Sequence, residues 1–202
     1  MTKSKKATST EIVFLKSNRV ILRPVLKKDL PQLLKWINDI EIQQYLNAHL
    51  PVMEAEEDEW FDALHKSRSQ VVFAIVADGK LIGNMGIHNI DHRNGTASTG
   101  ALIGNKKYWG KGYGSEAKMI LLNYAFNTLN LRKVSSSVIA FNERSYNYSK
   151  KCGYKDEGRL KAQHYAFGKY WDEILLAVFQ ADWQPLWVKF AKKHNLATGP
   201  QL

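Results

Sequence analysis

The sequence of 202 residues predicts a single α/β domain built on one mixed sheet with helices on both of its faces. Segments with strand-like and helix-like hydrophobic spacing alternate along the chain. Two pairs of turn residues, Asp78-Gly79 and Asn94-Gly95, mark tight hairpins between strands. No internal repeat or linker interrupts this order, and a chain of this length can bury one sizeable core.

In the first half of the chain we expect a strand, two helices and a hairpin. Pro24 ends the first strand because proline cannot donate a ladder hydrogen bond. Leu30, Leu33 and Ile37 then recur at helical spacing. In chain order, the expected elements are a strand over 18–23, helices over 29–38 and 53–67, and strands over 70–77 and 80–90.

The second half is expected to continue the alternation of strands and helices. In chain order, the expected elements are a strand over 96–104, a helix over 113–129, a strand over 133–141, a helix over 143–151 and two strands over 154–165 and 170–179. The helix over 113–129 is apolar on almost every side and should be buried. Asn142 is placed to cap the next helix and Gly153 to end it. We expect the domain to span 17–183, with a flexible basic tail over 1–16 and an amphipathic extension over 184–202.

The segment Tyr108–Ala117 carries three glycines at alternate positions, directly before the apolar helix. Glycine lets a ligand approach the main chain closely, and the start of a helix presents unpaired N–H groups at the positive end of a dipole. The segment therefore predicts a cradle for a pyrophosphate.

The spacing of the glycines excludes two common nucleotide motifs. A P-loop requires four residues between its glycines and a hydroxyl for magnesium, whereas Gly104 and Gly110 enclose five residues and Gly112 occupies the hydroxyl position. The dinucleotide fingerprint fails because Gly114 comes one position early and no acidic residue follows about twenty residues later.

The string Trp109–Gly114 resembles the [QR]-x-x-G-x-[GA] signature of the GNAT family of N-acetyltransferases, which grips the pyrophosphate of acetyl-coenzyme A. Trp109 replaces the usual Arg or Gln, and Tyr-Trp-Gly-Lys-Gly-Tyr is similar to the branch of bacterial ribosomal-protein N-terminal acetyltransferases. Independently, Asn142–Ser145 followed by Lys151–Tyr154 resembles the family's N-x-x-S...K-x-G-[FY] segment.

The resemblance implies a mostly antiparallel sheet that splays around the cofactor. The strand over 99–104 would separate from the strand over 134–140, and the pantetheine arm would fill the gap like an extra strand. The resemblance assigns ten cofactor-binding residues: Leu102, Gly104, Trp109, Gly110, Lys111, Gly112, Tyr113, Gly114, Ser115 and Asn142. It implies no metal.

Two catalytic residues are proposed on the same grounds. In many relatives a Tyr seven residues after the position of Asn142 protonates the departing thiolate. Ser149 occupies that position here, and Tyr146 and Tyr148 are alternatives. Relatives often carry a Glu base where this chain has Thr99, so His88 becomes the candidate base. Asp91, His92 or a water chain without any single base remain alternatives.

These observations predict an N-acetyltransferase that moves an acetyl group from acetyl-CoA to a primary amine, for example a protein N-terminus, by direct attack in a ternary complex. Two alternatives stay open: an acetyltransferase for polyamines or aminoglycosides, and a non-catalytic module that binds acyl-CoA or nucleic acid on the same fold. The acidic run 54–59 would suit a cationic amine, although negative charge also favours a helix start.

Charge and composition bound the partners and the compartment. The net charge of +10 suits a phosphate-bearing cofactor, and no nucleic-acid-binding motif accompanies it, so we expect nucleic acid only through a ribosomal substrate. No apolar run reaches membrane-spanning length, and the single Cys152 cannot form an internal disulfide. We expect a cytoplasmic monomer or homodimer that does not bind membranes.

Overall fold

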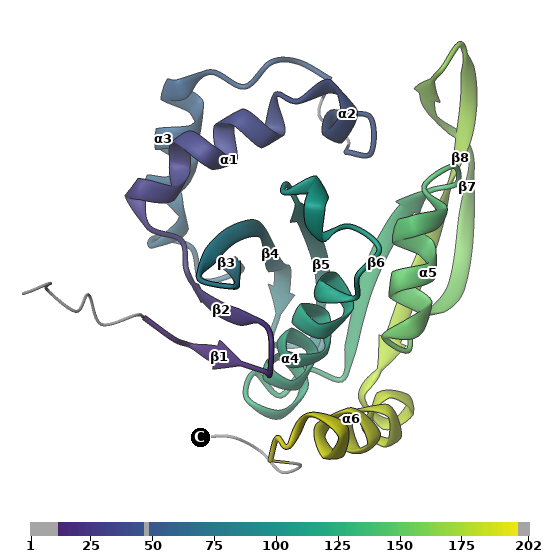
Figure 1. The fold of residues 1–202 in the computed structure, drawn as a ribbon. Coiled ribbons are helices and arrows are strands. Elements are labelled where there is room, and N and C mark those ends of the chain that lie inside the picture. Colours follow the sequence, from purple (N-terminus) through teal and green to yellow (C-terminus); the bar gives the residue numbers. More distant parts are fainter. Residues whose placement is uncertain (1–11, 47–48, 198–202) are drawn as a thin grey trace, which may run out of the picture.

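The computed structural model describes residues 12–46 and 49–197, and its centre is one eight-stranded sheet with the order β1-β2-β3-β4-β5-β6-β8-β7 (Figure 1). Every neighbouring pair is antiparallel except β5 and β6, which are parallel. The strands are β1 (Leu15–Lys16), β2 (Ile21–Pro24), β3 (Val71–Ala77), β4 (Lys80–Asp91), β5 (Thr96–Ile103), β6 (Lys133–Ile139), β7 (Lys155–Ala166) and β8 (Lys169–Phe179). The predicted mixed, mostly antiparallel sheet is confirmed.

Six α-helices and two short 3-10 helices surround the sheet in the described part of the chain. They are η1 (Lys27–Asp29), α1 (Leu30–Ile37), α2 (Ile40–Gln43), α3 (Glu54–Leu64), η2 (Lys106–Tyr108), α4 (Tyr113–Asn127), α5 (Glu143–Lys151) and α6 (Gln180–His194). The expected elements agree with these within a few residues. Strand β1 and helix α2 were not predicted, because two and four residues are too short to show a hydrophobic period.

The sheet separates two apolar clusters, and the alternation of side chains along β3 shows how. Phe73 and Ile75 belong to the larger cluster, with α4 and α6, whereas Ala74 belongs to the smaller one, with α1 and α2. Successive side chains of a strand point to opposite faces, so one strand serves both clusters. Helices therefore cover both faces of the sheet, as Figure 1 shows.

Helix α4 is buried on nearly every side, as its sequence predicted. Helix α6 is buried with it: Trp183, Trp187 and Ala191 belong to the same cluster, and the rings of Trp183 and Trp187 stack at 5.3 Å. The expected domain boundary after Trp183 falls inside this helix. The amphipathic segment is thus part of the core up to the end of α6. Residues 198–202 are not among the residues that the structure describes.

The N-terminal tail expected over 1–16 lies mostly outside the described residues. Its last two residues form β1, which pairs with β2 through Leu15↔Leu22 and Lys16↔Ile21. Within the described ranges, no helix has the length and apolar character that would let it cross a membrane.

Strands β5 and β6 pair over only three positions. Thr96–Ser98 lie opposite Lys133–Ser135, after which β5 runs on to Ile103 and β6 to Ile139 without further pairing to each other. On its other side β5 stays paired with β4 as far as Ile103. The two strands therefore separate in the middle of the sheet, and beyond Ser98 the backbone of β5 has no strand partner on that side.

Candidate active site

A cavity of about 900 Å³ occupies the gap between β5 and β6. Its walls come from both strands, from the glycine turn before α4, from α5 and from the loop around α2. Small hydroxyl side chains hold the strands where they part, since Ser135 Oγ donates to Ala97 O at 3.1 Å and Ser136 Oγ donates to Thr99 O at 3.2 Å.

The glycine turn meets the conditions of a phosphate cradle. Gly110 and Gly112 have φ angles of 71° and 85°, which L side chains rarely adopt. A Cβ atom at Gly110 would meet no atom within 4 Å, so the backbone is open to a ligand there. No side chain caps α4, and the first N–H groups of this 15-residue helix face the turn. These features fit a pyrophosphate.

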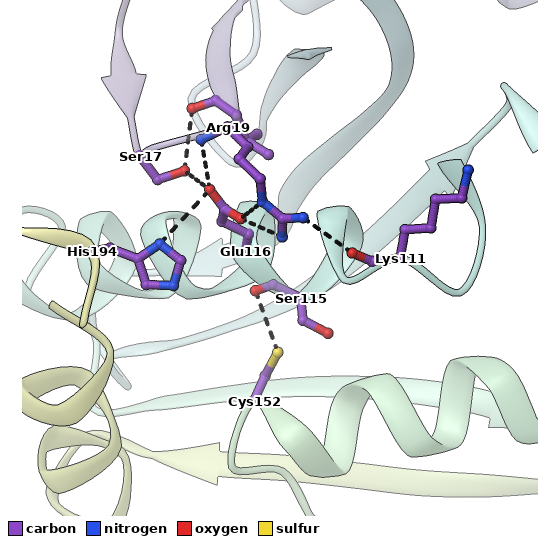
Figure 2. Close-up of polar contacts among 8 residues, drawn as sticks. Ser17, Arg19, Lys111, Ser115, Glu116, Cys152 and His194 are labelled. Carbon is purple, nitrogen blue, oxygen red and sulfur yellow. Dashed lines mark hydrogen bonds and ion pairs between the residues drawn. The ribbon is translucent and has the colours of Figure 1, made fainter. Parts of the chain in front are cut away.

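The turn is fastened from behind by a buried carboxylate, Glu116 (Figure 2). Glu116 Oε1 accepts hydrogen bonds from Ser17 Oγ at 2.7 Å and from Arg19 N at 2.8 Å, while its Oε2 lies 2.6 Å from Arg19 Nη2. Burial raises the pKa of the Glu116 carboxyl, but the hydrogen bonds from Ser17 and Arg19 outweigh it and hold that pKa below its ordinary value. Arg19 Nη1 also donates to Lys111 O at 3.3 Å, so the pair fixes the turn itself.

Trp109 stands where the family usually has Arg or Gln. Its Nε1 donates to Ile103 O at 2.6 Å, and the Arg144 guanidinium lies 3.7 Å from the centre of its ring. Such a stack can contribute up to about 2 kcal/mol when desolvated. Trp109 thereby ties the end of β5 to α5 across the mouth of the cavity.

Seven of the ten residues proposed to bind the cofactor line the cavity: Leu102, Trp109, Gly110, Gly112, Gly114, Ser115 and Asn142. The other three, Gly104, Lys111 and Tyr113, do not. A Cβ atom at Gly104 would lie 1.9 Å from the Trp36 ring, so glycine is required there by packing against α1. Tyr113 lies under the Arg19 guanidinium, 4.5 Å from it.

Helix α5 turns a different face to the cavity than the sequence suggested. Arg144, Ser145, Tyr148 and Lys151 line the cavity, but Ser149 does not. Ser149 is 1% exposed, and its Oγ is buried without a hydrogen-bond partner among the described residues. Asn142, the N-cap of α5 with a ψ of 63°, does line the cavity, so the two residues expected on one face differ in their surroundings.

The two tyrosines that the sequence offered as alternatives on α5 differ in their surroundings. The Tyr146 hydroxyl donates to the Asp156 carboxylate at 3.0 Å, outside the cavity. Tyr148 lines the cavity, and burial raises the pKa of its hydroxyl well above the ordinary value. The Tyr148 phenol therefore keeps its proton and can donate it.

His88 lines the cavity from β4, whereas Asp91 and His92 do not. Its Nδ1 lies 3.3 Å from Gln70 Oε1, and its Nε2 has no hydrogen bond to any residue that the structure describes. Burial lowers the pKa of the His88 imidazole, and the positive charge of Lys118 lowers it further. The ring is therefore neutral at physiological pH and can accept a proton.

Lys118 lies beneath the point where the strands separate and is fully buried. Its Nζ donates to Thr99 Oγ1 at 2.7 Å, and Thr99 Oγ1 lies 2.7 Å from the Tyr154 hydroxyl. Burial lowers the pKa of Lys118 to about 8. Thr99, at the position where relatives often carry Glu, is thus one member of a buried polar chain.

Two carboxylates that sequence reasoning had not singled out also line the cavity, Glu157 on β7 and Glu173 on β8. Glu157 Oε1 forms an ion pair with Lys133 at 2.5 Å. Glu173 is 13% exposed, and its Oε2 lies 3.3 Å from His164 Nε2. Only the pairing of β8 with β6, in which Glu173 lies opposite Ile139, brings them to the cavity. No local signal could have found them.

Cys152 stays outside the cavity. Its Sγ donates to Ser115 O at 3.7 Å, and burial raises the pKa of the thiol to about 12. A thiol in this state is a poor nucleophile.

Comparison with known proteins gives a consistent result. Residues 19–155 match the family described as "Acetyltransferase (GNAT) domain". The chain is 26% identical to spermidine N(1)-acetyltransferase of Escherichia coli K12 over an alignment of 164 residues. The alignment covers 81% of this chain and 88% of that protein. It is 30% identical over 110 residues, 54% of this chain and 60% of the relative, to Bacillus subtilis YdaF, which is named provisionally as a ribosomal N-acetyltransferase.

A solved structure agrees in fold. Spermidine N-acetyltransferase from Vibrio cholerae, crystallised with CoA and spermine, superposes with a TM-score of 0.76 over 82% of this chain and 98% of that one. The two sequences are 22% identical, so the likeness concerns the fold.

The glycine turn can be tested by placing a side chain in it. Gly112→Asp adds a Cβ at a φ of 85° and a negative charge beside the cradle, so the thermal stabilisation by coenzyme A should fall below one tenth of the wild-type response at equal concentration. Gly168→Asp is the matched control, because Gly168 also has a positive φ, 76°, and open space around it. A wild-type shift in Gly112→Asp would refute the cradle.

Proposed function

The chain belongs to the GNAT family of acetyltransferases, and from that premise we propose that it transfers the acetyl group of acetyl-coenzyme A to a cationic primary amine, by direct attack in a ternary complex. The proposal rests above all on the separation of β5 from β6, which opens a cavity directly onto the uncapped N-terminus of α4. Membership of an enzyme family favours this function over the non-catalytic module that the sequence had left open.

The cavity offers two kinds of contact to the cofactor. The unpaired backbone groups of β5 near Leu102 can pair with the amides of a pantetheine arm as a further strand would. The glycine turn and the first N–H groups of α4 can bind the pyrophosphate. Of the proposed binding residues, Gly104, Lys111 and Tyr113 would then act by shaping the turn and the strand end rather than by contact from inside the cavity.

Direct attack requires the chain to move two protons. The acceptor is an ammonium in water and must lose a proton, and the departing thiolate must gain one. No covalent acyl-enzyme is needed, and Cys152, protonated and outside the cavity, has no part in the proposed reaction.

We propose His88 as the group that accepts the proton from the amine. It lines the cavity, its Nε2 has no hydrogen-bond partner in the described part of the chain, and its lowered pKa keeps the ring neutral. A neutral imidazole of this kind loses its function only when the pH falls below its own pKa, which lies under 6.5.

The pH dependence of the rate tests this role. His88→Asn should lower kcat/KM for the acceptor by about 10²- to 10⁴-fold above pH 6.5. The ratio of wild-type to variant rates should shrink as the pH falls below 6.5, since only the wild type loses a base there. Protonation of the amine affects both proteins equally and cancels in this ratio. His92→Asn, at an exposed position outside the cavity, is the control. Equal rates in His88→Asn and wild type would favour a water chain.

We propose that Tyr148 donates the proton to the departing thiolate. The alternative donor is Ser149, the residue that the sequence suggested, which is buried next to Tyr148 on α5. Tyr148 lines the cavity with a neutral phenol, whereas the Ser149 hydroxyl faces the interior. A thiol has an ordinary pKa near 8.5, so the leaving group is only moderately basic and the gain from the donor is modest.

Two conservative variants separate the donors. Tyr148→Phe keeps the ring beside Gly114 and should lower the single-turnover rate about 10- to 1,000-fold, with acetyl-CoA affinity within about threefold of wild type. Ser149→Ala should stay within about threefold of the wild-type rate. The reverse pattern would make Ser149 the donor, and wild-type rates in both variants would assign the proton to solvent.

The carboxylates in the cavity wall favour a cationic amine as the acceptor. Glu173 is largely buried and lines the wall, and Glu157 lies on the neighbouring strand. A partly buried carboxylate attracts an ammonium more strongly than an exposed one does. Two relatives are named for spermidine, a cation with several amines. A polyamine is therefore our first candidate, and the N-terminus of a ribosomal protein, in line with the name of YdaF, is the second.

Thiol release from acetyl-CoA, measured over a panel of amines, tests the function and the acceptor together. The panel holds spermidine, spermine, an aminoglycoside, peptides with free N-termini and free amino acids. Glu173→Gln should raise KM for the best acceptor at least tenfold and leave coenzyme A affinity unchanged. Glu59→Gln, an exposed acid on α3, should change neither. Absence of release with every amine would overturn the proposed transfer, and an unchanged KM in Glu173→Gln would overturn the acceptor site.

A further inference from the structure

Lys118 on α4 is a buried cation without an anion to neutralise it. Its side chain is fully buried, and its Nζ donates to Thr99 Oγ1 at 2.7 Å. In the described part of the chain no carboxylate pairs with it, and Thr99 Oγ1 is the one hydrogen-bond acceptor for its three N–H groups. A buried charge that lacks a counter-ion is costly, so a group of this kind is a candidate for a functional role.

The Lys118 ammonium faces two aromatic rings. Its Nζ lies 5.4 Å from the centre of the Tyr148 ring and 5.4 Å from the centre of the Tyr154 ring. A cation within about 6 Å of a ring centre is attracted to the ring. Its other titratable neighbours are Cys152, at the end of α5, and His88, on β4. Of the two tyrosines, Tyr148 lines the cavity and Tyr154 does not.

The proton transfer proposed for Tyr148 is unfavourable without a nearby cation. Burial raises the pKa of the Tyr148 phenol well above its ordinary value, whereas an ordinary thiol has a pKa near 8.5. The phenol by itself is therefore a weaker acid than the thiol that it would form. An opposite charge close to a phenolate favours the ionised form, and Lys118 is the cation that faces this ring among the described residues.

We propose that Lys118 is a positioning residue that acts through Tyr148, with its buried ammonium stabilising the phenolate that forms when Tyr148 protonates the thiolate of coenzyme A. In this step the O–H bond of Tyr148 breaks and an S–H bond forms. The negative charge moves from the sulfur to the tyrosine that Lys118 faces, and the phenolate regains its proton from water before the next turnover. The proposal rests on the proposed function and on Tyr148 as the donor.

The charge of Lys118 gives this role a pH signature. Burial lowers the pKa of Lys118 to about 8, so the ammonium is present at pH 7 and is lost as the pH rises through 8. Its stabilisation of the phenolate is lost with it. The protonation of His88 does not change in this range, because burial, the larger of the two causes, already holds its pKa below 6.5.

Lys118→Met tests the role, since methionine adapts to the space and needs no counter-ion. At pH 7 it should lower the single-turnover rate of acetyl transfer about 10- to 100-fold, and by no more than Tyr148→Phe does. The ratio of wild-type to variant rates should shrink between pH 7 and pH 9, because only the wild type loses a charge beside Tyr148. Protonation of the acceptor amine affects both proteins equally and cancels in this ratio.

Two further variants separate this role from a structural one. Lys118→Gln keeps a hydrogen-bond donor for Thr99 but no charge, so its loss of rate should match that of Lys118→Met. In a Tyr148→Phe background, Lys118→Met should change the rate less than about threefold, since no phenolate forms there. A residue that only holds the strands together would lower the rate by the same factor in both backgrounds.

Lys150→Met is the matched control, because Lys150 also faces a tyrosine ring, that of Tyr146 at 5.5 Å, but is exposed and lies outside the cavity. It should keep the wild-type rate. A wild-type rate in Lys118→Met or in Tyr148→Phe would overturn the proposal. A rate restored by Lys118→Gln, an equal loss in both backgrounds, or a ratio that stays constant from pH 7 to pH 9 would also overturn it. These outcomes leave the proposed function standing, whereas absence of acetyl transfer by wild type would overturn that function.

Discussion

The incomplete pairing of β5 with β6 is the constraint on which the site depends. The two strands pair at three positions, and beyond Ser98 and Ser135 they no longer pair with each other. Unpaired backbone groups inside a protein are costly, so a gap of this kind persists only where water or a ligand can satisfy them. Strand β5 leads into α4 through η2 and the glycine turn. The gap and the cradle are therefore close to each other along the chain.

Helix α4 carries two buried charges on opposite sides of this feature. Glu116, in the first turn, is paired with Arg19 and holds the turn from outside. Lys118, two residues later, faces the junction of the strands, where hydroxyl groups and not a carboxylate receive it. Since desolvation brings the pKa of Lys118 to about 8, part of its population is neutral near physiological pH. Its remaining charge helps to keep His88 unprotonated, so a residue without access to the cavity influences one that lines it.

Charged side chains of both signs line the proposed path of the substrates. Two cavities have cationic side chains in their walls, Arg144 and Lys151 in the one between β5 and β6 and Arg19 and Lys193 in a smaller one between α4 and α6, and the first cavity is also lined by the carboxylates of Glu157 and Glu173. The charged side chains that give the net charge of +10 are therefore not spread evenly over the protein. The presence of both signs of charge suits a reaction between an anionic cofactor and a cationic acceptor, because each would be attracted to side chains of opposite charge.

The sequence by itself determined what depends on neighbours along the chain. The hairpin at Asp78-Gly79, the glycine turn, the Asn142 cap and the buried nature of α4 are local signals, set by backbone torsions and by hydrophobic period. The resemblance of two motifs also indicated the family and seven of the residues that line the cavity. Only the tertiary structure decided which face of α5 meets the cavity, that α6 completes the core, and that Glu157 and Glu173 line the cavity. Those outcomes follow from the register of β6, β7 and β8 and from packing between elements far apart in sequence, which no local pattern encodes.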